Sequence, residues 1–307
     1  MSRQVVMLCG GVGGARLAHG MYHALSQDEL TLIVNTGDDF EHWGLQICPD
    51  LDTVMYSLAD LAPVERGWGL ETESFEALDM VKRYGGEDWF ALGDRDLATH
   101  LMRSQRLREG HSLTSVTQGL ASSLGVHCSL LPMSDDSCAS VLMTEDWGPL
   151  SFQQWFVKHQ AKPTVRDISW AYGANASVQV QEALAAADLV VIAPSNPYVS
   201  IDPILQLPKM DNLLERPTVI AVSPIVHGEA VKGPLAQMIR DLSGQAPSPA
   251  AVARHYGECL DAMIMESGEP SDALSVQSLR TSTIMKTRDD SRRLADRILE
   301  FTESSLK

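Results

Sequence analysis

Residues 4–35 constrain the fold of this chain more than any other segment. The apolar run QVVMLC (4–9) ends in a cluster of glycines, and the segment after the glycines carries apolar residues at helical spacing. A second apolar run, LTLIVN (30–35), follows. A buried strand, a glycine turn, a helix and a second strand make a βαβ unit, which is typical of a doubly wound sheet. We therefore expect an α/β fold with parallel strands at its centre.

Later segments extend this pattern. Residues from about 65 to 125 carry mainly helical patterns, and a final amphipathic helix covers 291–303. We predict a single α/β domain over 1–307, with a Rossmann-like, three-layer fold, a mainly parallel sheet and a mainly helical insertion at about 65–125. Further strands are expected in the apolar runs at 126–131, 140–144, 188–194 and 217–224.

Composition disfavours several classes of protein. The chain has 307 residues and a formal net charge of −16, which disfavours binding to nucleic acid or to an anionic membrane. No apolar run approaches the roughly 20 residues that a membrane-spanning helix needs, and the N-terminal sequence turns to glycines too early for a secretory signal. The five cysteines are dispersed, without zinc-finger or disulfide spacing. We expect a cytoplasmic protein whose cysteines are packing residues and which has no nucleic-acid or membrane partner.

The glycine cluster is a candidate phosphate-binding loop. Its glycines lie between the first strand and the first helix, where backbone N–H groups and the helix dipole favour an anion. It is not the dinucleotide fingerprint, because Arg16 occupies the third glycine position, and it lacks the Gly-Lys-Ser/Thr of a P-loop. The alternative is a sharp turn that needs small residues. The glycines concerned are Gly10, Gly11, Gly13 and Gly14.

Two acids at the start of the next helical pattern, Asp50 and Asp52, have two possible roles. Asp50 is well placed as an N-cap and Asp52 lies in the first helical turn, where a carboxylate is favourable. Asp38 and Asp39 follow the second strand and could be turn formers. Two carboxylates about 5 Å apart repel by roughly 3 kcal/mol at an effective dielectric near 20, and a magnesium ion would remove that penalty. The local sequence leaves both roles open.

Other polar segments are candidates for a ligand crevice. Arg95, between two acids at another helix start, gains little there from the helix dipole and is suited to bind a carboxylate or phosphate; a surface ion pair is the alternative. His19 and His23 share a helical face but have no evident third ligand, so we expect satisfied or exposed histidines. Polar loops that end strands provide Ser134, Asp135, Asp136, Ser195 and Asn196, each of which could equally belong to an ordinary turn.

Taken together, these motifs resemble the 2-phospho-L-lactate transferase (CofD) family in their order and spacing, from about residue 8 to about residue 290. The combination of GDRD, PMSDD and PSNP is specific, whereas GGVGG by itself is not. The motifs are GGVGG (10–14), NTGDDFEHWG (35–44), PDLDTVMY (49–56), GDRD (93–96), PMSDD (132–136) and PSNP (194–197).

The resemblance implies a function. Enzymes of this family make the deazaflavin coenzyme F420: they transfer a phospholactyl, phosphoenolpyruvyl or phosphoglyceryl group from a guanosine-diphosphate-linked donor to the ribityl hydroxyl of 7,8-didemethyl-8-hydroxy-5-deazariboflavin, and release GMP. They depend on Mg²⁺ and have a Rossmann-like core. Family habit further implies a homodimer. The sequence does not indicate which three-carbon acid the donor carries.

The resemblance also implies roles for particular residues. Asp52 and Arg95 would contact the deazaflavin acceptor, while the glycine cluster and the PMSDD and PSNP loops would line the guanine nucleotide and its phosphates. Attack of an alcohol on a diphosphate needs charge neutralisation and a proton acceptor. Mg²⁺ held by Asp50 or Asp52 would polarise the phosphoryl oxygens, one of these carboxylates could receive the proton, and Arg95 could stabilise the developing charge.

The sequence allows two other functions. CofD-like proteins include nucleotide-sugar-binding regulators without transferase activity, and deazaflavin binding would distinguish the enzyme from such a regulator. A Rossmann-type dehydrogenase is disfavoured, because the third glycine and an acidic residue placed for ribose are both lacking.

Overall fold

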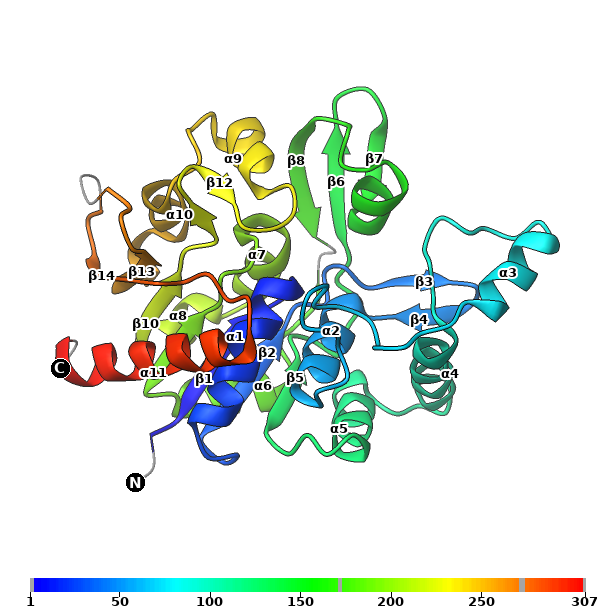
Figure 1. Cartoon of the computed structure of the whole chain (residues 1–307), viewed down its shortest axis with the longest axis horizontal. Coiled ribbons are helices and arrows are strands. Elements are labelled where there is room, and N and C mark those ends of the chain that lie inside the picture. Colours follow the sequence, from blue (N-terminus) through cyan, green and yellow to red (C-terminus); the bar gives the residue numbers. More distant parts are fainter. Residues whose placement is uncertain (1–2, 171–172, 271–273, 306–307) are drawn as a thin grey trace.

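A computed structural model describes residues 3–170, 173–270 and 274–305 of the chain. In this part of the chain, seven parallel strands form a central sheet with the order β14-β13-β10-β9-β1-β2-β5 (Figure 1). The prediction of an α/β fold with a parallel sheet is confirmed. The strands are β1 (Val5–Cys9), β2 (Leu30–Val34), β5 (Ser129–Pro132), β9 (Leu189–Ile192), β10 (Thr218–Val222), β13 (Ala262–Glu266) and β14 (Gln277–Thr281).

The strand order reverses at β1, which defines where a ligand can bind. The chain runs outward from β1 through β2 to β5 and then returns to the other side of β1 at β9. Val5 pairs with Leu30 on one side and with Leu189 on the other. In open parallel sheets the crevice for a ligand lies at such a switch point, beyond the carboxyl ends of the strands. The loops after β1 and β9 are therefore the expected walls of a site.

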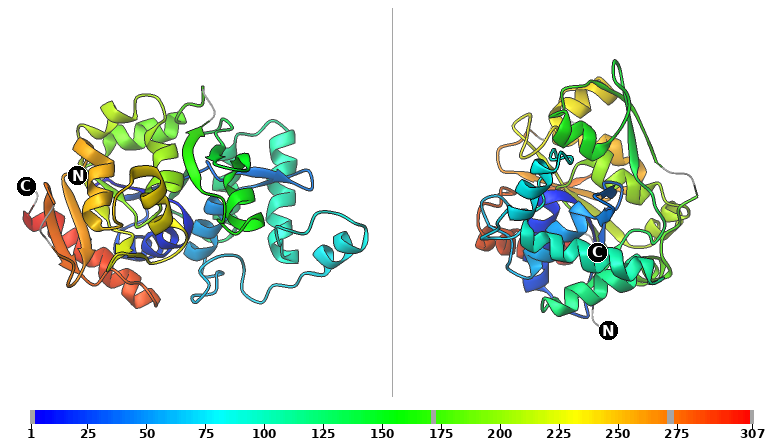
Figure 2. Two further views of the ribbon diagram at one scale, coloured as in Figure 1. Left: turned by 90° about the horizontal axis from the view of Figure 1, so that it is seen from above. Right: turned by 90° about the vertical axis from the view of Figure 1, so that its right-hand side faces the viewer.

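Helices cover both faces of the central sheet (Figure 2). Alternating residues of the strands pack in two separate core clusters, one on each face. Val5, Met7 and Cys9 pack in one core cluster, whereas Val6 and Leu8 pack in the other. The first layer contains α1 (Gly11–Ala24), α2 (Pro49–Leu58), α5 (Leu113–Ser123) and α11 (Arg288–Ser305). The second contains α6 (Val178–Ala186), α7 (Asp202–Leu205), α8 (Met210–Leu214), α9 (Leu235–Ser243) and α10 (Pro249–Tyr256).

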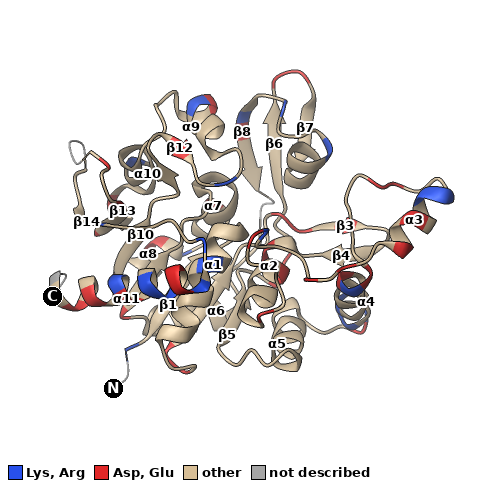
Figure 3. Cartoon of the chain, viewed as in Figure 1, with Lys and Arg blue, Asp and Glu red and all other residues tan. Residues whose placement is uncertain are grey.

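Close approach of α1 and α11 depends on one glycine. A Cβ on Gly20 would lie 2.1 Å from the carbonyl oxygen of Ser291, so no larger residue fits there without separating the helices. The central strands β1, β2, β9 and β10 carry no charged residue, and the charged residues lie on helices, loops and outer strands (Figure 3). None of the helices in the described residues combines the length and apolar composition that a bilayer crossing requires.

Segments outside the central sheet surround its carboxyl edge. The region predicted as a helical insertion holds α3 (Glu76–Arg83), α4 (Asp94–Arg108) and α5, separated by loops. A hairpin of β3 (Phe40–His42) and β4 (Leu45–Ile47) precedes α2. The elements that complete this edge are β6 (Ser140–Thr144), β7 (Gly148–Ser151), β8 (Val165–Trp170), the π-helices η1 (Gln154–Lys158) and η2 (Pro197–Ile201), and the pair β11 (Ile225–Val226) and β12 (Glu229–Ala230). The 3₁₀-helix η3 (Gly257–Cys259) lies at the opposite edge, before β13.

The strand predicted at 140–144 exists, but it belongs to a separate sheet. It is β6, the central strand of an antiparallel sheet with the order β7-β6-β8. Its side chains alternate between buried and more exposed positions, the pattern of a strand with one buried face, whereas strands of the parallel sheet are buried on both faces.

Candidate active site

The loops after β1 and β9 meet at the switch point. The hydroxyl of Ser195 accepts a hydrogen bond from the N–H of Gly10 (3.1 Å) and donates one to the Gly10 carbonyl (2.7 Å). A Cβ on Gly13 would lie 2.4 Å from the carbonyl oxygen of Pro194, and a Cβ on Gly14 would lie 2.7 Å from Ser195 Oγ. The glycines therefore allow the two loops to pack against each other, and the Ser195 hydroxyl is occupied within the protein.

The amino end of α1 opens towards this site. Its N-cap, Gly10, supplies no side-chain cap, and Gly11 has a positive φ of 62°. The N–H of Gly11 donates a hydrogen bond to Asp50 Oδ1 (2.7 Å). Because first-turn N–H groups of a helix have no intrahelical acceptor, they can bind an anion such as a phosphate.

Asp50 is not the N-cap that the sequence suggested. Cys48 holds that position in α2 and Pro49 is the first helical residue, so Asp50 lies inside the first turn. Its side chain instead reaches the neighbouring strand ends: Oδ2 accepts a hydrogen bond from Asn35 Nδ2 (2.9 Å), and Asn35 follows β2. Burial raises the pKa of Asp50 to about 6, although the hydrogen bonds from Asn35 and Gly11 oppose this shift.

Asp38 and Asp39 lie beside Asp50, and we call these three residues the switch-point acids. Asp38 is buried; burial, followed by the charge of Asp50, raises its pKa well above the ordinary value. Burial also raises the pKa of Asp39. Asp38 Oδ1 and Asp39 Oδ1 are both buried without a hydrogen-bond partner in the described residues. Carboxylate oxygens in this state fit a divalent cation with oxygen ligands.

Asp52 has a counter-ion within the protein. The guanidinium of Arg103 on α4 donates to both of its carboxylate oxygens, with Nη1 3.0 Å from Oδ2 and Nη2 close to Oδ1. His100 Nδ1 lies 3.6 Å from Asp52 Oδ2. Burial opposes the charge of Arg103, but Asp52 and the other nearby anionic groups outweigh it and raise the Arg103 pKa overall. Asp52 therefore needs a metal ion less than the switch-point acids do.

A hydrogen-bond network continues from Asp52 along α4. His100 Nε2 lies 3.4 Å from Asp96 Oδ1, and the same oxygen accepts a hydrogen bond from the Tyr56 hydroxyl (2.6 Å). Tyr56 Oη is also 2.8 Å from Thr99 Oγ1. Asp52, Asp96 and His100 place ligand atoms within 4.8 Å of one another, but Arg103 is bonded to the same Asp52 carboxylate.

Arg95 begins α4 as predicted, but its side chain is exposed. Nη1 donates to the Glu71 carbonyl (2.7 Å) and lies 3.2 Å from Thr72 Oγ1. Its neighbour Asp94 does not pair with it, because Asp94 bonds Ser74 and the backbone at the start of α3. The predicted alternative of an Arg–Asp surface pair is therefore absent between these two residues. Within the described part of the chain, the Arg95 guanidinium bonds only oxygens of the 71–72 loop.

The remaining candidates stabilise loops at the strand ends. Ser134 Oγ donates to the Asn175 carbonyl (2.6 Å), and Asp136 Oδ2 accepts from Asn175 N (3.1 Å). Asp135 accepts from Thr114 N (2.7 Å) at the start of α5. Asn196 caps η2 by accepting from Tyr198 N (3.0 Å). These side chains lie at the predicted edge of the sheet, but each has a partner within the protein.

Arg103, His100 and Asn35 were not predicted from the sequence as site residues. The signal for the first two was present: Asp96, His100 and Arg103 are spaced by four and three residues, so they lie on one face of α4. A helix face that carries three titratable side chains and is nonetheless buried requires a partner, which here is Asp52. No comparable pattern marks Asn35, whose contacts join distant segments.

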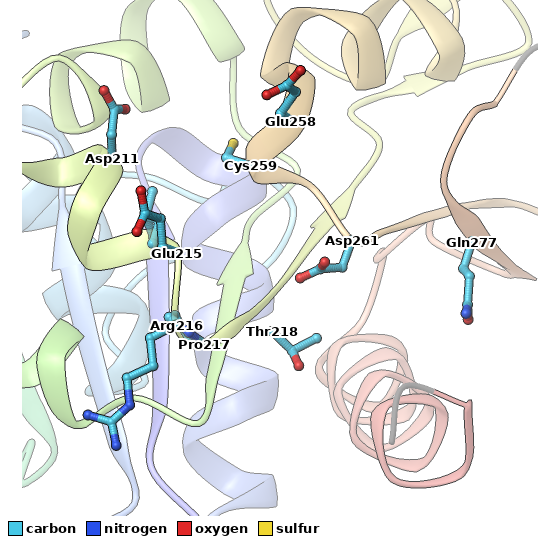
Figure 4. A pocket seen from close by; sticks show the side chains of 10 residues that line it. Asp211, Glu215, Arg216, Pro217, Thr218, Glu258, Cys259, Asp261 and Gln277 are labelled. Atoms are coloured by element: carbon cyan, nitrogen blue, oxygen red, sulfur yellow. The ribbon is translucent and has the colours of Figure 1, made fainter.

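A surface cavity of about 780 Å³ lies elsewhere (Figure 4). Its lining includes Thr218 and Gln277, the first residues of β10 and β14. Because the strands are parallel, this cavity lies at the amino edge of the sheet, opposite the switch point. It contains no residue of the predicted site, and we place the active site by the geometry of the switch point.

The fold and the site together define a doubly wound α/β protein with an acidic, open helix terminus at its switch point, the arrangement of nucleotide-handling enzymes. The family model for 2-phospho-L-lactate transferase CofD matches residues 5–306, and the chain belongs to this family. It is accordingly a transferase of coenzyme F420 biosynthesis.

Curated relatives carry two different names. A 2-phospho-L-lactate transferase from Methanosarcina mazei is 36% identical over 303 residues, covering 96% of this chain and 99% of its own. A phosphoenolpyruvate transferase from Mycobacterium sp. (strain KMS) is 38% identical over 302 residues, covering 89% and 91%. These relatives support the predicted enzyme rather than the regulator without transferase activity.

A solved structure supports the fold alone. A member of the UPF0052 family from Bacillus halodurans superposes with a TM-score of 0.66 at 16% sequence identity, covering 97% of this chain and 99% of that one.

Proposed function

We propose that this enzyme transfers a phospholactyl, phosphoenolpyruvyl or phosphoglyceryl group from a guanosine-diphosphate-linked donor to the ribityl hydroxyl of 7,8-didemethyl-8-hydroxy-5-deazariboflavin. The acceptor oxygen forms a bond to the phosphorus that carries the three-carbon acid, the bond from that phosphorus to the bridging oxygen breaks, and GMP leaves. The donor's acid stays open, because relatives named for phospholactate and for phosphoenolpyruvate are similarly identical to this chain.

One observation carries the proposal. Among the described residues, Asp38 Oδ1 and Asp39 Oδ1 are buried without a hydrogen-bond partner, and Asp50, whose charge acts on both, bonds Gly11 at the open N-terminus of α1. An anionic diphosphate would approach the N–H groups of α1, and the acids alone would repel it. A divalent cation held by these acids would offset that repulsion.

The proposed cofactor is Mg²⁺, held by Asp38 and Asp50. This assignment revises the sequence-based one, which paired Asp50 with Asp52, because Arg103 already neutralises Asp52. Bound there, Mg²⁺ would neutralise charge on the diphosphate oxygens. The amino end of α1 binds phosphate oxygens, and the glycine loop keeps side chains from blocking it.

The acceptor side of the site would be formed by Asp52 and Arg95. Arg103 bonds both oxygens of Asp52 and orients the carboxylate, so Asp52 is suited to accept a hydrogen bond from the acceptor. Asp39, which is not among the proposed metal ligands and whose pKa is raised, is better suited to receive the proton of the acceptor hydroxyl. Arg95, which bonds oxygens of the 71–72 loop, can turn towards an anionic or carbonyl oxygen.

Incubation of the purified enzyme with the deazaflavin, Mg²⁺ and each guanosine-diphospho donor separately tests this function. Chromatography with fluorescence detection should show a phosphorylated deazaflavin with at least one donor, and a chelator should abolish it. Absence of product with all three donors would contradict the proposal. The proposal includes the homodimer that the family resemblance implies, which sedimentation of the free enzyme tests.

A further inference from the structure

A second group of ligand-type side chains lies on the outer half of α1, away from the switch point. His19 and His23 are separated by one helical turn, and Asp60 follows α2 with a positive φ of 58°. His19 is buried, whereas His23 and Asp60 are exposed. The third ligand that the sequence did not reveal is therefore Asp60, which tertiary structure brings to the histidine pair. His19 is eight residues beyond Gly11, roughly 12 Å along the helix axis.

The contacts of this group converge on one nitrogen atom. His19 Nε2 lies 3.1 Å from Asp60 Oδ1 and 3.1 Å from His23 Nε2. One imidazole nitrogen carries at most one proton, so hydrogen bonds to both partners would have to share a single N–H of His19. A cation that accepts three lone pairs would satisfy all three side chains together.

The distances suit a small metal ion. The three ligand atoms lie within 4.8 Å of one another. Two nitrogens bound tetrahedrally to zinc at about 2.05 Å are roughly 3.3 Å apart. The 3.1 Å separations from His19 Nε2 are close to that value, so the metal-bound arrangement needs only small side-chain movements.

We propose that His19, His23 and Asp60 form a binding site for Zn²⁺, with water completing its coordination. Imidazole nitrogens favour zinc over magnesium, which prefers oxygen ligands. Two histidines with one carboxylate are a known zinc ligand set. The site is independent of the proposed transfer reaction and of the switch-point acids. A bound ion would link α1 to the loop after α2.

Arg288 limits the affinity of this site. Its Nη2 lies 2.8 Å from Asp60 Oδ1, the oxygen that also faces His19, and its Nη1 bonds the Ser57 carbonyl. The guanidinium holds the Asp60 carboxylate in position but repels a cation. We therefore expect a reversible site rather than a permanently loaded one.

The test is zinc binding by tag-free protein, with Mg²⁺ in excess. Competition with a zinc-sensitive dye gives the affinity, and Co²⁺ substitution gives visible ligand-field bands that report imidazole coordination. His23→Gln and Asp60→Asn each remove one ligand at an exposed position, and Asn tolerates the positive φ of residue 60. His127→Gln removes an exposed histidine elsewhere and is the matched control.

The wild type and the His127→Gln variant should bind one zinc equivalent that the two ligand variants bind more than about tenfold more weakly. Zinc should also raise the melting temperature of the wild type more than that of His23→Gln. Zinc held by other groups would survive both ligand substitutions. Equal affinity in the wild type, His23→Gln and Asp60→Asn, or no zinc bound at micromolar free zinc, would overturn the proposal.

Discussion

The carboxylate of Asp52 and the guanidinium of Arg103 form a buried, two-pronged ion pair between α2 and α4. This pair separates the acids at the carboxyl edge of the sheet into two kinds. Asp52 has its counter-ion within the protein, whereas the neighbouring Asp38 and Asp50 share Asn35 and form no ion pair with any described residue. The switch-point acids are therefore where a bound cation would neutralise the most negative charge.

Removal of Arg103 should destabilise the protein strongly. Arg103→Gln leaves Asp52 buried and unpaired, a change that typically costs about 3–5 kcal/mol. Denaturant unfolding measures this loss, and the double variant with Asp52→Asn should recover part of it. Arg108→Gln, an exposed arginine near the end of the same helix, should change stability by less than about 0.5 kcal/mol. Equal effects of Arg103→Gln and Arg108→Gln would contradict the importance of the pair.

The metal-free enzyme should gain stability from Asp50 as pH falls from 7 towards 4. Burial raises the pKa of Asp50 from 3.8 to about 6, so between these values the folded state binds more protons than the unfolded state. Protonation therefore favours folding in this window. Thermal unfolding of wild type and Asp50→Asn would be measured in the presence of a chelator. Lowering the pH from 7 to 5 should increase the stability of the wild type relative to that of Asp50→Asn. A difference independent of pH would show that Asp50 has no raised pKa.

Gly13→Ala should disrupt the switch point. The added Cβ would lie 2.4 Å from the Pro194 carbonyl oxygen, and overpacking of this kind costs about 1–3 kcal/mol. Transfer activity should fall as well, because the loops after β1 and β9 must separate. Gly119→Ala is the control: its Cβ meets only the end of the Arg106 side chain, and alanine favours the interior of α5. Comparable losses in both variants would contradict a specific role for the Gly13 contact.

Arg95 should affect binding of the acceptor without affecting stability. Its side chain is exposed and its guanidinium bonds the 71–72 loop, so Arg95→Gln should change the free energy of unfolding by less than about 0.5 kcal/mol. Loss of a hydrogen bond from a charged group should raise KM for the deazaflavin about tenfold. Steady-state kinetics with Arg83→Gln, an exposed arginine of α3, as control would test this. An unchanged KM would remove Arg95 from the site.

The sequence predicted the local parts of this structure well. Continuous apolar runs predicted β1, β2, β9 and β10, which are strands buried on both faces of the sheet. The glycine cluster predicted the start of α1. β13 and β14 were missed; β14 carries polar and charged residues because it is an edge strand, exposed along much of its length.

The site depends on contacts that no local pattern contains. Asp50 bonds Gly11 and Asn35 across 39 and 15 residues, and Arg103 reaches Asp52 across 51. The local sequence allowed either a helix cap or a metal ligand for Asp50 and Asp52. Only the fold shows that Asp52 is already paired with Arg103. Asp38, which the sequence treated as a turn former, is a buried member of the site for the same reason.

The dependence of transfer on Mg²⁺ in three proteins tests the central claim most directly. Initial rates of deazaflavin phosphorylation would be measured against Mg²⁺ concentration for the wild type, Asp50→Asn and Asp52→Asn. We predict saturable activation of the wild type, a half-saturating Mg²⁺ concentration raised more than about tenfold in Asp50→Asn, and a lower rate with little change in that concentration in Asp52→Asn. A wild-type rate independent of Mg²⁺, or a shift in Asp52→Asn but not in Asp50→Asn, would contradict the assignment of the metal to the switch-point acids.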